Sequence, residues 1–437
     1  MFAANNKATR FAVPLLCLSV LAACGGQDKA GGSPNAQSAD KPDIASQPAE
    51  LTIYDSSGNK LDWIMDNYGN KLKEKFPNYK ITIVPQDNAK SLENLISSGG
   101  NADIVTSATG SIVFDMQMQS DISDLIAKYK YDLSKLEPTT VEIQKKLANG
   151  GLYALPAWTT TGVLFYNKDI FDKFGVPYPK DGMTWDDIYE LAKKTTRMDN
   201  NVQYRGLSMA FEHIMMLNQL GAAHIDLSTN KSLFTADNFK KAFENLVRFY
   251  QIPGNGMPGN KFFFANEQDP FYKNNTIAMF MTLHGGGRTY KDSVNWDTVT
   301  LPILKDKPEI GSQSYPNFFF LSKTSKNRDA AFQVLSYLTS NEFQQFVVRN
   351  GYIPILKDQS IAQQIGADIP EYKGKNIKAA LPKTFAPPTI KTKYQSIANT
   401  ETSAALNAVV SGTDVNTALR EAGERVDKKI AAQLGAK

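Results

Sequence analysis

Residues 150–168 have the sequence Gly150-Gly-Leu-Tyr-Ala-Leu-Pro-Ala-Trp-Thr-Thr-Thr-Gly-Val-Leu-Phe-Tyr-Asn-Lys168, and this stretch decides the fold. Two short apolar runs within it, Leu152–Leu155 and Gly162–Tyr166, have the pattern of buried strands. Pro156 lies between them. Because it lacks a backbone N–H and favours an extended residue before it, we expect the chain to leave one sheet there without entering a helix. The stretch therefore predicts a crossing between two lobes, with the indole and hydroxyl groups of Trp158–Thr161 at the crossing point.

The N-terminus has the form of a secretory signal. Lys7 and Arg10 precede an apolar run over residues 11–23, which is too short to cross a bilayer as a helix. The run leads into Ala22-Ala-Cys24, which resembles the lipobox of bacterial lipoproteins. That resemblance implies that residues 1–23 are a lipoprotein signal peptide and that Cys24 is lipidated; the alternative is an ordinary signal with a chance cysteine. Residues 24–50, rich in Gly, Ser, Ala and Pro, are expected to form a flexible tether.

Cysteine content and charge exclude several classes of protein. Cys17 lies inside the signal, so the mature domain is predicted to lack disulfides, thiol nucleophiles and cysteine-ligated metals. Loss of Lys7 and Arg10 with the signal lowers the net charge from +4 to +2. So small an excess of positive charge gives no indication of nucleic-acid binding. No later run is long and apolar enough to cross a membrane. We therefore expect a domain that a lipid anchors to the cell membrane, facing the periplasm or the exterior.

The first part of the main body alternates strands with helices. The predicted strands are Leu51–Tyr54, Ile81–Val84 and Asp103–Val105, and helices are predicted at Leu61–Phe76 and Ala89–Ser98. This βαβ pattern is typical of a mainly parallel sheet, in which ligands bind beyond the carboxyl ends of the strands. We expect the polar loops 55–59 and 106–110 and the patch 158–161 to lie at that edge.

The rest of the chain is too long for one hydrophobic core, since about 390 residues follow the tether. Asn167 and Gly175 are expected to cap a helix, and Thr184-Trp-Asp-Asp187 resembles a capping box. Pro302 and Gly351–Pro354 mark two further candidate crossings. The later strands are predicted at Thr276–Thr282, Thr298–Leu301 and Phe318–Leu321. The later helices are predicted at Phe211–Leu220, Ala236–Tyr250, Asn327–Leu338, Asn341–Val348, Ile390–Ser411 and Thr413–Leu434.

Several stretches together resemble the extracellular solute-binding proteins of bacterial ABC importers, in particular the carbohydrate-type family 1. They are Leu152–Pro156, Val163–Lys168, Phe174–Pro177, Met183–Ile188, Phe271–Met279, Leu321–Leu338 and Gly351–Pro354. One departure is Asn274-Asn275, where the family has a Gly-Lys pair. The resemblance implies an α/β, type II periplasmic-binding-protein-like fold, with two lobes of mainly parallel sheet flanked by helices and joined by crossing strands. The N-terminal lobe is expected over 51–155 and 299–353, and the C-terminal lobe over 156–298 and 354–437.

A site for a sugar needs neutral donors and acceptors together with aromatic rings. The residues that we expect to contact the solute are Asp55, Ser56, Ser107, Thr109, Trp158, Thr160, His284, Arg288, Tyr315, Asn317 and Tyr394. Trp158 could instead pack beneath the hinge, Asp55 could cap its loop, and the Gly-rich segment after His284 could be a tight turn. The runs Phe262–Phe264 and Phe318–Phe320 are interpreted as buried structure.

Nothing in the sequence points to catalysis. The three histidines are scattered, no metal or cofactor motif is present, and no pair of carboxylates can be placed as in a glycosidase. We therefore expect a monomeric, non-enzymatic protein without cofactors that captures a mono- or oligosaccharide by hinge closure and delivers it to an ABC permease. The alternatives are a membrane-tethered carbohydrate-active enzyme and a binding protein for a non-sugar solute.

Overall fold

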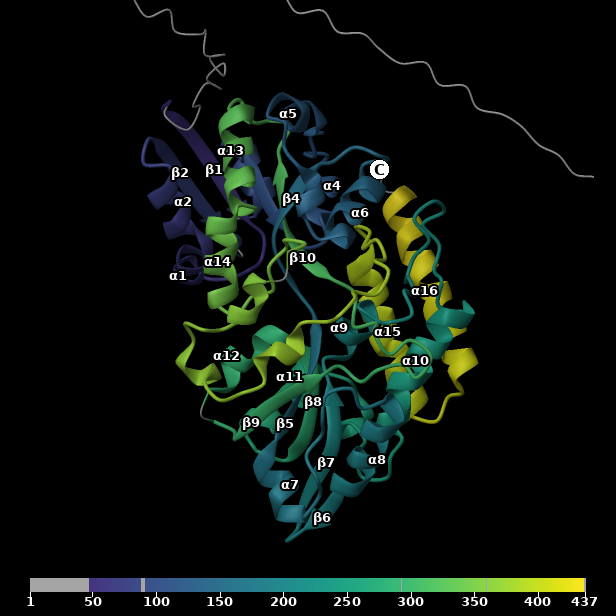
Figure 1. The fold of residues 1–437 in the computed structure, drawn as a ribbon. Coiled ribbons are helices and arrows are strands. Elements are labelled where there is room, and N and C mark those ends of the chain that lie inside the picture. The colour runs from purple at the N-terminus through teal and green to yellow at the C-terminus, as the bar shows by residue number, and fades with distance from the viewer. Residues whose placement is uncertain (1–46, 88–90, 292, 359, 436–437) are drawn as a thin grey trace, which may run out of the picture. The chain divides into compact units, whose positions relative to one another are not determined.

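The structure is a computed structural model that describes residues 47–87, 91–291, 293–358 and 360–435. The predicted signal peptide, Cys24 and residues 24–46 of the predicted tether lie outside the described residues. The described residues belong to one compact unit, Ile44–Lys437, which contains two five-stranded sheets (Figure 1).

The first sheet has the strand order β2-β1-β3-β10-β4. Its strands are β1 (Ala49–Asp55), β2 (Tyr79–Pro85), β3 (Ile104–Ser107), β4 (Ala154–Thr160) and β10 (Tyr315–Leu321). Strand β1 pairs in parallel with β2 and β3, as the βαβ pattern predicts, whereas β10 runs antiparallel to both β3 and β4. The helices that accompany the first sheet are α1 (Leu61–Ile64), α2 (Asn70–Lys75), α3 (Leu92–Ser97), α4 (Ser111–Asp115), α5 (Ser123–Lys128), α6 (Pro138–Leu147), α13 (Arg328–Leu338) and α14 (Asn341–Arg349).

The second sheet has the order β6-β7-β8-β5-β9. Its strands are β5 (Gly162–Asn167), β6 (Arg197–Asp199), β7 (Val202–Met209), β8 (Ile277–Leu283) and β9 (Trp296–Thr300). The prediction of mainly parallel pairing is wrong here, because only β7 and β8 pair in parallel. Strand β5 enters from the first sheet beside the carboxyl end of β8, where Gly162 pairs with Leu283, and it must therefore run antiparallel to β8.

The helices around the second sheet include the two longest of the described part of the chain. They are α7 (Lys168–Phe174), α8 (Trp185–Thr195), α9 (Phe211–Met216), α10 (Asp237–Tyr250), α11 (Phe264–Tyr272), α12 (Gly287–Tyr290), α15 (Gln395–Val410) and α16 (Val415–Gly435). Asn167 caps α7 and Thr184 forms the capping box of α8 with Asp187, as predicted. Helix α9 ends four residues before its predicted end, because the amide of Asn218 bonds to the backbone around it.

The first crossing lies later in the chain than Pro156, where it was expected. Strand β4 continues through Pro156 to Thr160. It lies at the edge of its sheet, where proline is tolerated, and a bulge places Ala157 opposite no residue of β10. The chain therefore reaches the second sheet at Gly162. A second crossing joins β9 to β10. After α14, the chain passes Ile353, which pairs with Thr159, and continues through irregular segments to α15.

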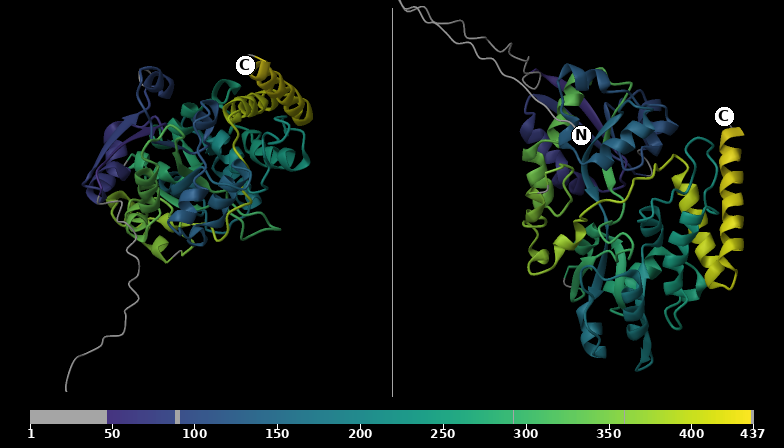
Figure 2. Two further views of the ribbon diagram at one scale, coloured as in Figure 1. Left: turned by 90° about the horizontal axis from the view of Figure 1, so that it is seen from above. Right: turned by 45° about the vertical axis from the view of Figure 1, so that its right-hand side comes forward.

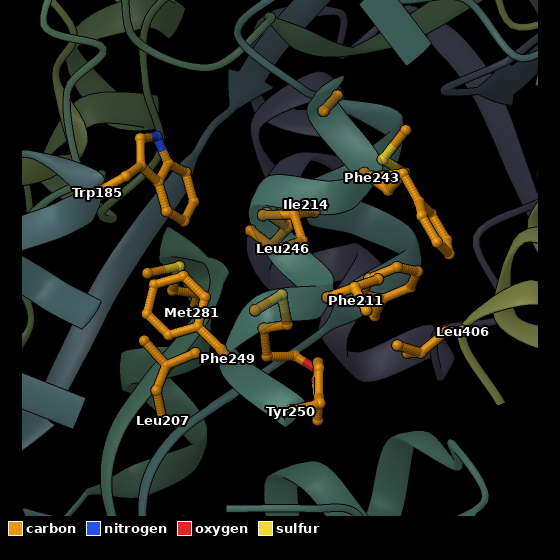
Figure 3. Close-up of a cluster of buried hydrophobic side chains, with 14 of the residues drawn as sticks. Trp185, Leu207, Phe211, Ile214, Phe243, Leu246, Phe249, Tyr250, Met281 and Leu406 are labelled. Carbon is orange, nitrogen blue, oxygen red and sulfur yellow. The ribbon is translucent and has the colours of Figure 1, made fainter. Parts of the chain in front are cut away.

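The second sheet and its helices enclose the larger apolar core (Figure 3). Leu207 and Met281 come from neighbouring strands, and the aromatic rings of Phe211 and Phe243 meet edge to face at 5.8 Å between centroids. Helices α15 and α16 lie side by side and both pack on α10 (Figure 2). This packing fixes the start of α9 and one face of α15, from which the candidate site is built.

Candidate functional site

The carboxyl end of β7 and the start of α9 form one wall of a cavity of about 490 Å³. Helix α15 and the segment before α11 supply the other walls. The cavity is lined by Ala210, Glu212, His213, Phe262, Phe263, Phe264, Thr400, Ser403, Ala404 and Asn407. A position beyond the carboxyl end of a parallel strand is where α/β sheets bind their ligands.

Glu212 and His213 give this cavity its polar floor. An oxygen of Glu212 accepts a hydrogen bond from the hydroxyl of Ser403 at 2.8 Å, so helix α15 fixes the carboxylate. Burial lowers the pKa of His213, and the neighbouring Glu212 opposes this effect only in part. The imidazole is therefore neutral near pH 7, and one ring nitrogen can donate while the other accepts.

Two phenylalanine rings stand open at the same cavity. Phe263 is 62% exposed and Phe264 is 41% exposed, whereas Phe262 packs against the core and its backbone N–H bonds to Asn407. The interpretation of all three as buried structure is therefore wrong for Phe263 and Phe264. Aromatic faces that remain exposed beside polar groups are suited to the C–H faces of a ligand.

A second, much smaller cavity, of about 10 Å³, is lined by Ala108, Thr109, Ile143, Leu147, Ser314, Tyr315, Pro316, Thr389 and Lys391. Tyr315 lies close to the first cavity, since its ring centroid is 6.4 Å from that of His213. Burial raises the pKa of Tyr315, which keeps its phenol protonated at neutral pH. Groups from both sheets thus meet at Tyr315.

Three of the predicted contact residues come together at this point. Thr109 and Tyr315 line the second cavity, and the hydroxyl of Thr160 donates to the carbonyl of Tyr315 at 3.3 Å. Thr160 is the last residue of β4, at the crossing itself. These residues remain our candidates for solute contact.

The predicted residues at the ends of β1 and β3 serve their own loops. Asp55 accepts from the backbone N–H of Ser57 and, at 2.7 Å, from the hydroxyl of Tyr68. Ser56 donates to the carbonyl of Thr106, and the hydroxyl of Ser107 accepts from the N–H of Gly110. Their polar atoms therefore have protein partners, in line with the alternative that they tie down backbone.

Trp158 and Tyr394 are buried in the two cores. Trp158 is 4% exposed and its ring lies among those of Tyr68, Phe319 and Tyr352. Tyr394 is 3% exposed and belongs to the core of the second sheet. Both side chains are packed inside an apolar core, so we no longer expect either of them to contact the solute. Asn317 pairs with Trp158 across the sheet, and its side-chain oxygen is buried without a partner.

His284 and Arg288 hold the crossing segments. The ring of His284 accepts from the N–H of Thr161 at 3.4 Å and bonds to the carbonyl of Gly351 at 3.1 Å. Arg288 bonds to the carbonyl of Asn350 and lies over the ring of Tyr352, 4.8 Å from its centroid. The Gly-rich segment is thus a short turn that joins the first crossing to the third.

No group of three or more His, Cys, Asp or Glu side chains in the described part of the chain is arranged to bind a metal ion. Within those same ranges, no helix has both the length and the apolar surface required to cross a bilayer.

Residues 57–345, well over half of the chain, match the sequence model of the family described as bacterial extracellular solute-binding protein. The chain belongs to this family. The predicted family and the two-lobe α/β fold class are thereby confirmed.

Three similar proteins illustrate the relationship. The galactooligosaccharide-binding protein of Bacillus subtilis (strain 168) is 29% identical over 199 residues, which cover 44% of this chain and 41% of that protein. An ABC substrate-binding protein of Listeria monocytogenes, in complex with cycloalternan, has a TM-score of 0.68 at 21% identity and covers 88% of this chain and 100% of its own. Maltose-bound T. maritima MalE3 has a TM-score of 0.62 at 15% identity, with 87% and 99% covered. The first two are named as binding proteins, and the third is described with maltose bound.

Sequence reasoning missed the residues that α9 and α15 bring to this solute-binding protein's cavity. Glu212 and His213 carry no motif. A usable signal does exist in α15, where polar residues recur every three or four positions in an Ala-rich helix: Ser396, Thr400, Ser403 and Asn407. Residues with this spacing share one helix face. Three of them line the cavity.

Proposed function

We propose that this solute-binding protein captures a neutral mono- or oligosaccharide at the first cavity, beside Tyr315, and delivers it to an ABC permease. The observation that carries the proposal is the lining of the first cavity, which combines the open rings of Phe263 and Phe264 with the polar groups of Glu212, His213 and Ser403. Similar proteins named for galactooligosaccharide, cycloalternan and maltose support the choice of a carbohydrate.

The chemistry of the lining fits a sugar. A sugar presents hydroxyls at its edges and C–H groups on its faces, and each hydroxyl that is buried without a partner costs about 1–3 kcal/mol. Neutral groups that both donate and accept, such as His213, Tyr315 and Thr109, can match those hydroxyls individually. Among the residues that line the two cavities, Glu212 is the one carboxylate, Lys391 is the one lysine, and there is no arginine. That balance disfavours a strongly charged solute.

Solute binding is coupled to closure because both sheets supply contact groups. Thr109, Thr160 and Tyr315 belong to the first sheet and its loops, and Glu212 and His213 to the second. A solute that touches both sets binds the closed state more tightly than the open state and shifts the equilibrium toward it. We assign the lobes along the sheets, with the chain passing between them after Thr160, between β9 and β10, and after α14.

The experiment that tests this function is calorimetry of the purified mature protein against a panel of maltose, mannobiose, galactooligosaccharides and D-mannitol. Chromatography of each mixture follows. We expect heat of binding with at least one sugar, and the sugar recovered unchanged. If no sugar gives heat and a polyamine or an organic anion binds, the site would be one for a charged solute and not for a sugar. Conversion of the sugar would establish the enzyme alternative instead.

The family is extracellular, and we further propose that Cys24 anchors this member to the cell membrane by lipid. Expression of the wild type and of Cys24→Ser in a bacterial host, with immunoblots of membrane and soluble fractions, tests the anchor. We expect the wild type in the membrane fraction and the variant in the soluble extracytoplasmic fraction. Equal distribution of the two proteins would contradict the lipid anchor and leave the solute site unaffected.

A further inference from the structure

A buried ion pair joins the start of α11 to strand β7. Arg205 of β7 and Glu267 of α11 are 7% and 0% exposed, and Nη2 of Arg205 donates to a carboxylate oxygen of Glu267 at 2.9 Å. The hydroxyl of Ser208 shares its proton between the same carboxylate oxygen, at 2.6 Å, and the backbone carbonyl of Glu267, at 2.9 Å. Two residues of β7 thus hold Glu267 through directed hydrogen bonds.

Glu267 attaches the two open phenylalanine rings to the strand. Of the nine residues of α11, all of which the structure describes, only Glu267 and Phe271 are buried, and Phe271 packs in a different apolar core one turn further on. Phe264 is the first residue of the helix and Phe263 is its N-cap, so both lie within about one turn of Glu267. The first turn of α11 is therefore held on β7 mainly through Glu267.

The same strand anchors the chain on the other side of the rings. Asn255 is completely buried; its side-chain oxygen accepts from the N–H of Leu207 at 3.1 Å, and its NH₂ group donates to the carbonyl of Leu207 at 2.8 Å. The guanidinium of Arg205 also donates to the backbone carbonyl of Asn255, at 3.4 Å. Residues 256–266, which contain both open rings, are thus held by β7 at each end, and Arg205 bonds at both ends.

An ion pair in this position is better suited to direction than to stability. Burial of two charges costs free energy, and apolar residues of similar volume often replace such a pair without loss of stability. Among the described residues, Nη1 of Arg205 is buried without a hydrogen-bond partner, so its desolvation is not fully offset. Hydrogen bonds, unlike apolar contacts, require fixed positions of their donors and acceptors. The pair therefore specifies where α11 lies on β7.

We propose that Arg205 and Glu267 are positioning residues of the solute site, which fix the first turn of α11 on β7 and thereby hold the rings of Phe263 and Phe264 in place for the sugar. The inference rests on the proposed function, in which these rings contact the C–H faces of the solute. Rings that are already held in the binding position lose less conformational freedom when the solute arrives, so the solute binds more tightly.

Hydrogen–deuterium exchange of the full mature protein tests the positioning without any solute. The buried-pair variant, Arg205→Met/Glu267→Leu, removes both charges together and leaves neither of them buried alone. Peptides covering residues 256–268 report on the segment, because the N–H of Phe262 bonds to the side chain of Asn407. We expect faster exchange in these peptides, unchanged exchange in α16 and no fall in the urea midpoint of unfolding. Wild-type exchange over residues 256–268, or an equal loss of protection in α16, would overturn the proposal.

The matched control is Asp269→Asn/Lys273→Gln. These residues form an ion pair on the same helix, at 2.8 Å, but their side chains are 34% and 56% exposed. We expect wild-type exchange in the control, and exchange as fast as in the buried-pair variant would overturn the proposal. Should the buried-pair variant fail to fold, Ser208→Ala makes the decision, since it removes the hydroxyl's bonds to Glu267 and keeps the ion pair. Faster exchange over residues 256–268 then supports the proposal, and wild-type exchange overturns it.

Affinity for a sugar separates positioning from a purely structural role. The sugar is whichever of maltose or mannobiose gives heat with the wild type. We expect affinity about fivefold weaker in the buried-pair variant and about tenfold weaker in Phe263→Ala/Phe264→Ala. The variant that combines all four substitutions should bind no more weakly than Phe263→Ala/Phe264→Ala, because the pair acts through the rings and the two losses do not add.

Wild-type affinity in the buried-pair variant, or additive losses in the combined variant, would overturn the positioning role and leave carbohydrate capture intact. Absence of binding of any sugar to the wild type would refute the proposed function. The exchange experiment would still decide whether the buried pair fixes the start of α11.

Discussion

Glu212 owes its place in the site to one hydrogen bond, from the hydroxyl of Ser403. The bond holds the carboxylate at a cavity that His213 also lines. An ionised acceptor binds a hydroxyl more strongly than a neutral one does. Glu212 is therefore the single residue whose chemistry we expect to contribute most to sugar affinity.

The variant Glu212→Gln tests this role. It keeps the size of the side chain and the contact with Ser403 but removes the charge, so sugar affinity should fall about tenfold in calorimetry. Glu190→Gln is the matched control, because Glu190 pairs with Lys193 on the exposed face of α8. Equal affinities of wild type and Glu212→Gln would remove Glu212 from the site.

Helix α15 carries Thr400, Ser403 and Asn407 into the cavity, and α16 holds it in place. The connection is Glu401, whose side chain is 5% exposed and bonds to Arg425 and Lys429 of α16, each at 2.6 Å. Burial opposes ionisation of Glu401, but these two cations outweigh it and lower the pKa of the carboxyl group. The C-terminal helix thus orients a wall of the site from outside it.

Glu401→Gln should reduce the free energy of unfolding by about 1–2 kcal/mol, because the neutral amide can accept only one of the two hydrogen bonds and carries no charge, while Arg425 and Lys429 can turn to water. Urea unfolding followed by circular dichroism measures the change. Glu424→Gln, which removes an exposed partner of Arg420 on the same helix, should leave the midpoint where it is. Similar losses in both variants would show that Glu401 is no more than a surface charge.

The whole molecule joins two sheets by three crossings, and it buries His224 and His284. Among the residues that the structure describes, no carboxylate forms a hydrogen bond or ion pair with either imidazole. Burial lowers the pKa of His224 to about 3, with a further contribution from Lys391, and that of His284 to about 4. An imidazole in the unfolded chain titrates near 6.5. As the pH falls below about 6.5, the unfolded chain binds protons that the folded chain does not. The free energy of unfolding therefore becomes smaller as the pH falls.

The variant His224→Phe isolates one of these groups. Its ring should pack edge to face against Phe234 and Phe239, as the ring of His224 does. Between pH 7 and pH 5 the wild type should lose about 2 kcal/mol more unfolding free energy than the variant, by linkage at this single site. Urea titrations at the two pH values give both numbers. Parallel losses would mean that His224 does not titrate differently in the folded and unfolded chains.

The sequence by itself determined the alternation of strands and helices, the caps at Asn167 and Thr184, and the family, because each is encoded by residues close together in the chain. Apolar periodicity and capping are local physics, and the order of many loose motifs identifies a family even where each alone is weak. The same local information predicted Thr109 and Thr160 at one edge of a sheet and named Tyr315 as a further candidate contact.

Only the tertiary structure decided which rings are covered and which are open. Trp158, near the end of β4, and Phe263, just before α11, are both aromatic. The ring of Trp158 is enclosed by those of Tyr68, Phe319 and Tyr352, whereas Phe263 lines a cavity. Exposure depends on what distant segments place against a side chain, and so does the meeting of Glu212 with Ser403, 191 residues apart. The local sequence pattern does not indicate which distant residues will become neighbours. For that reason the site, unlike the fold, could be identified only from the packing of the folded chain.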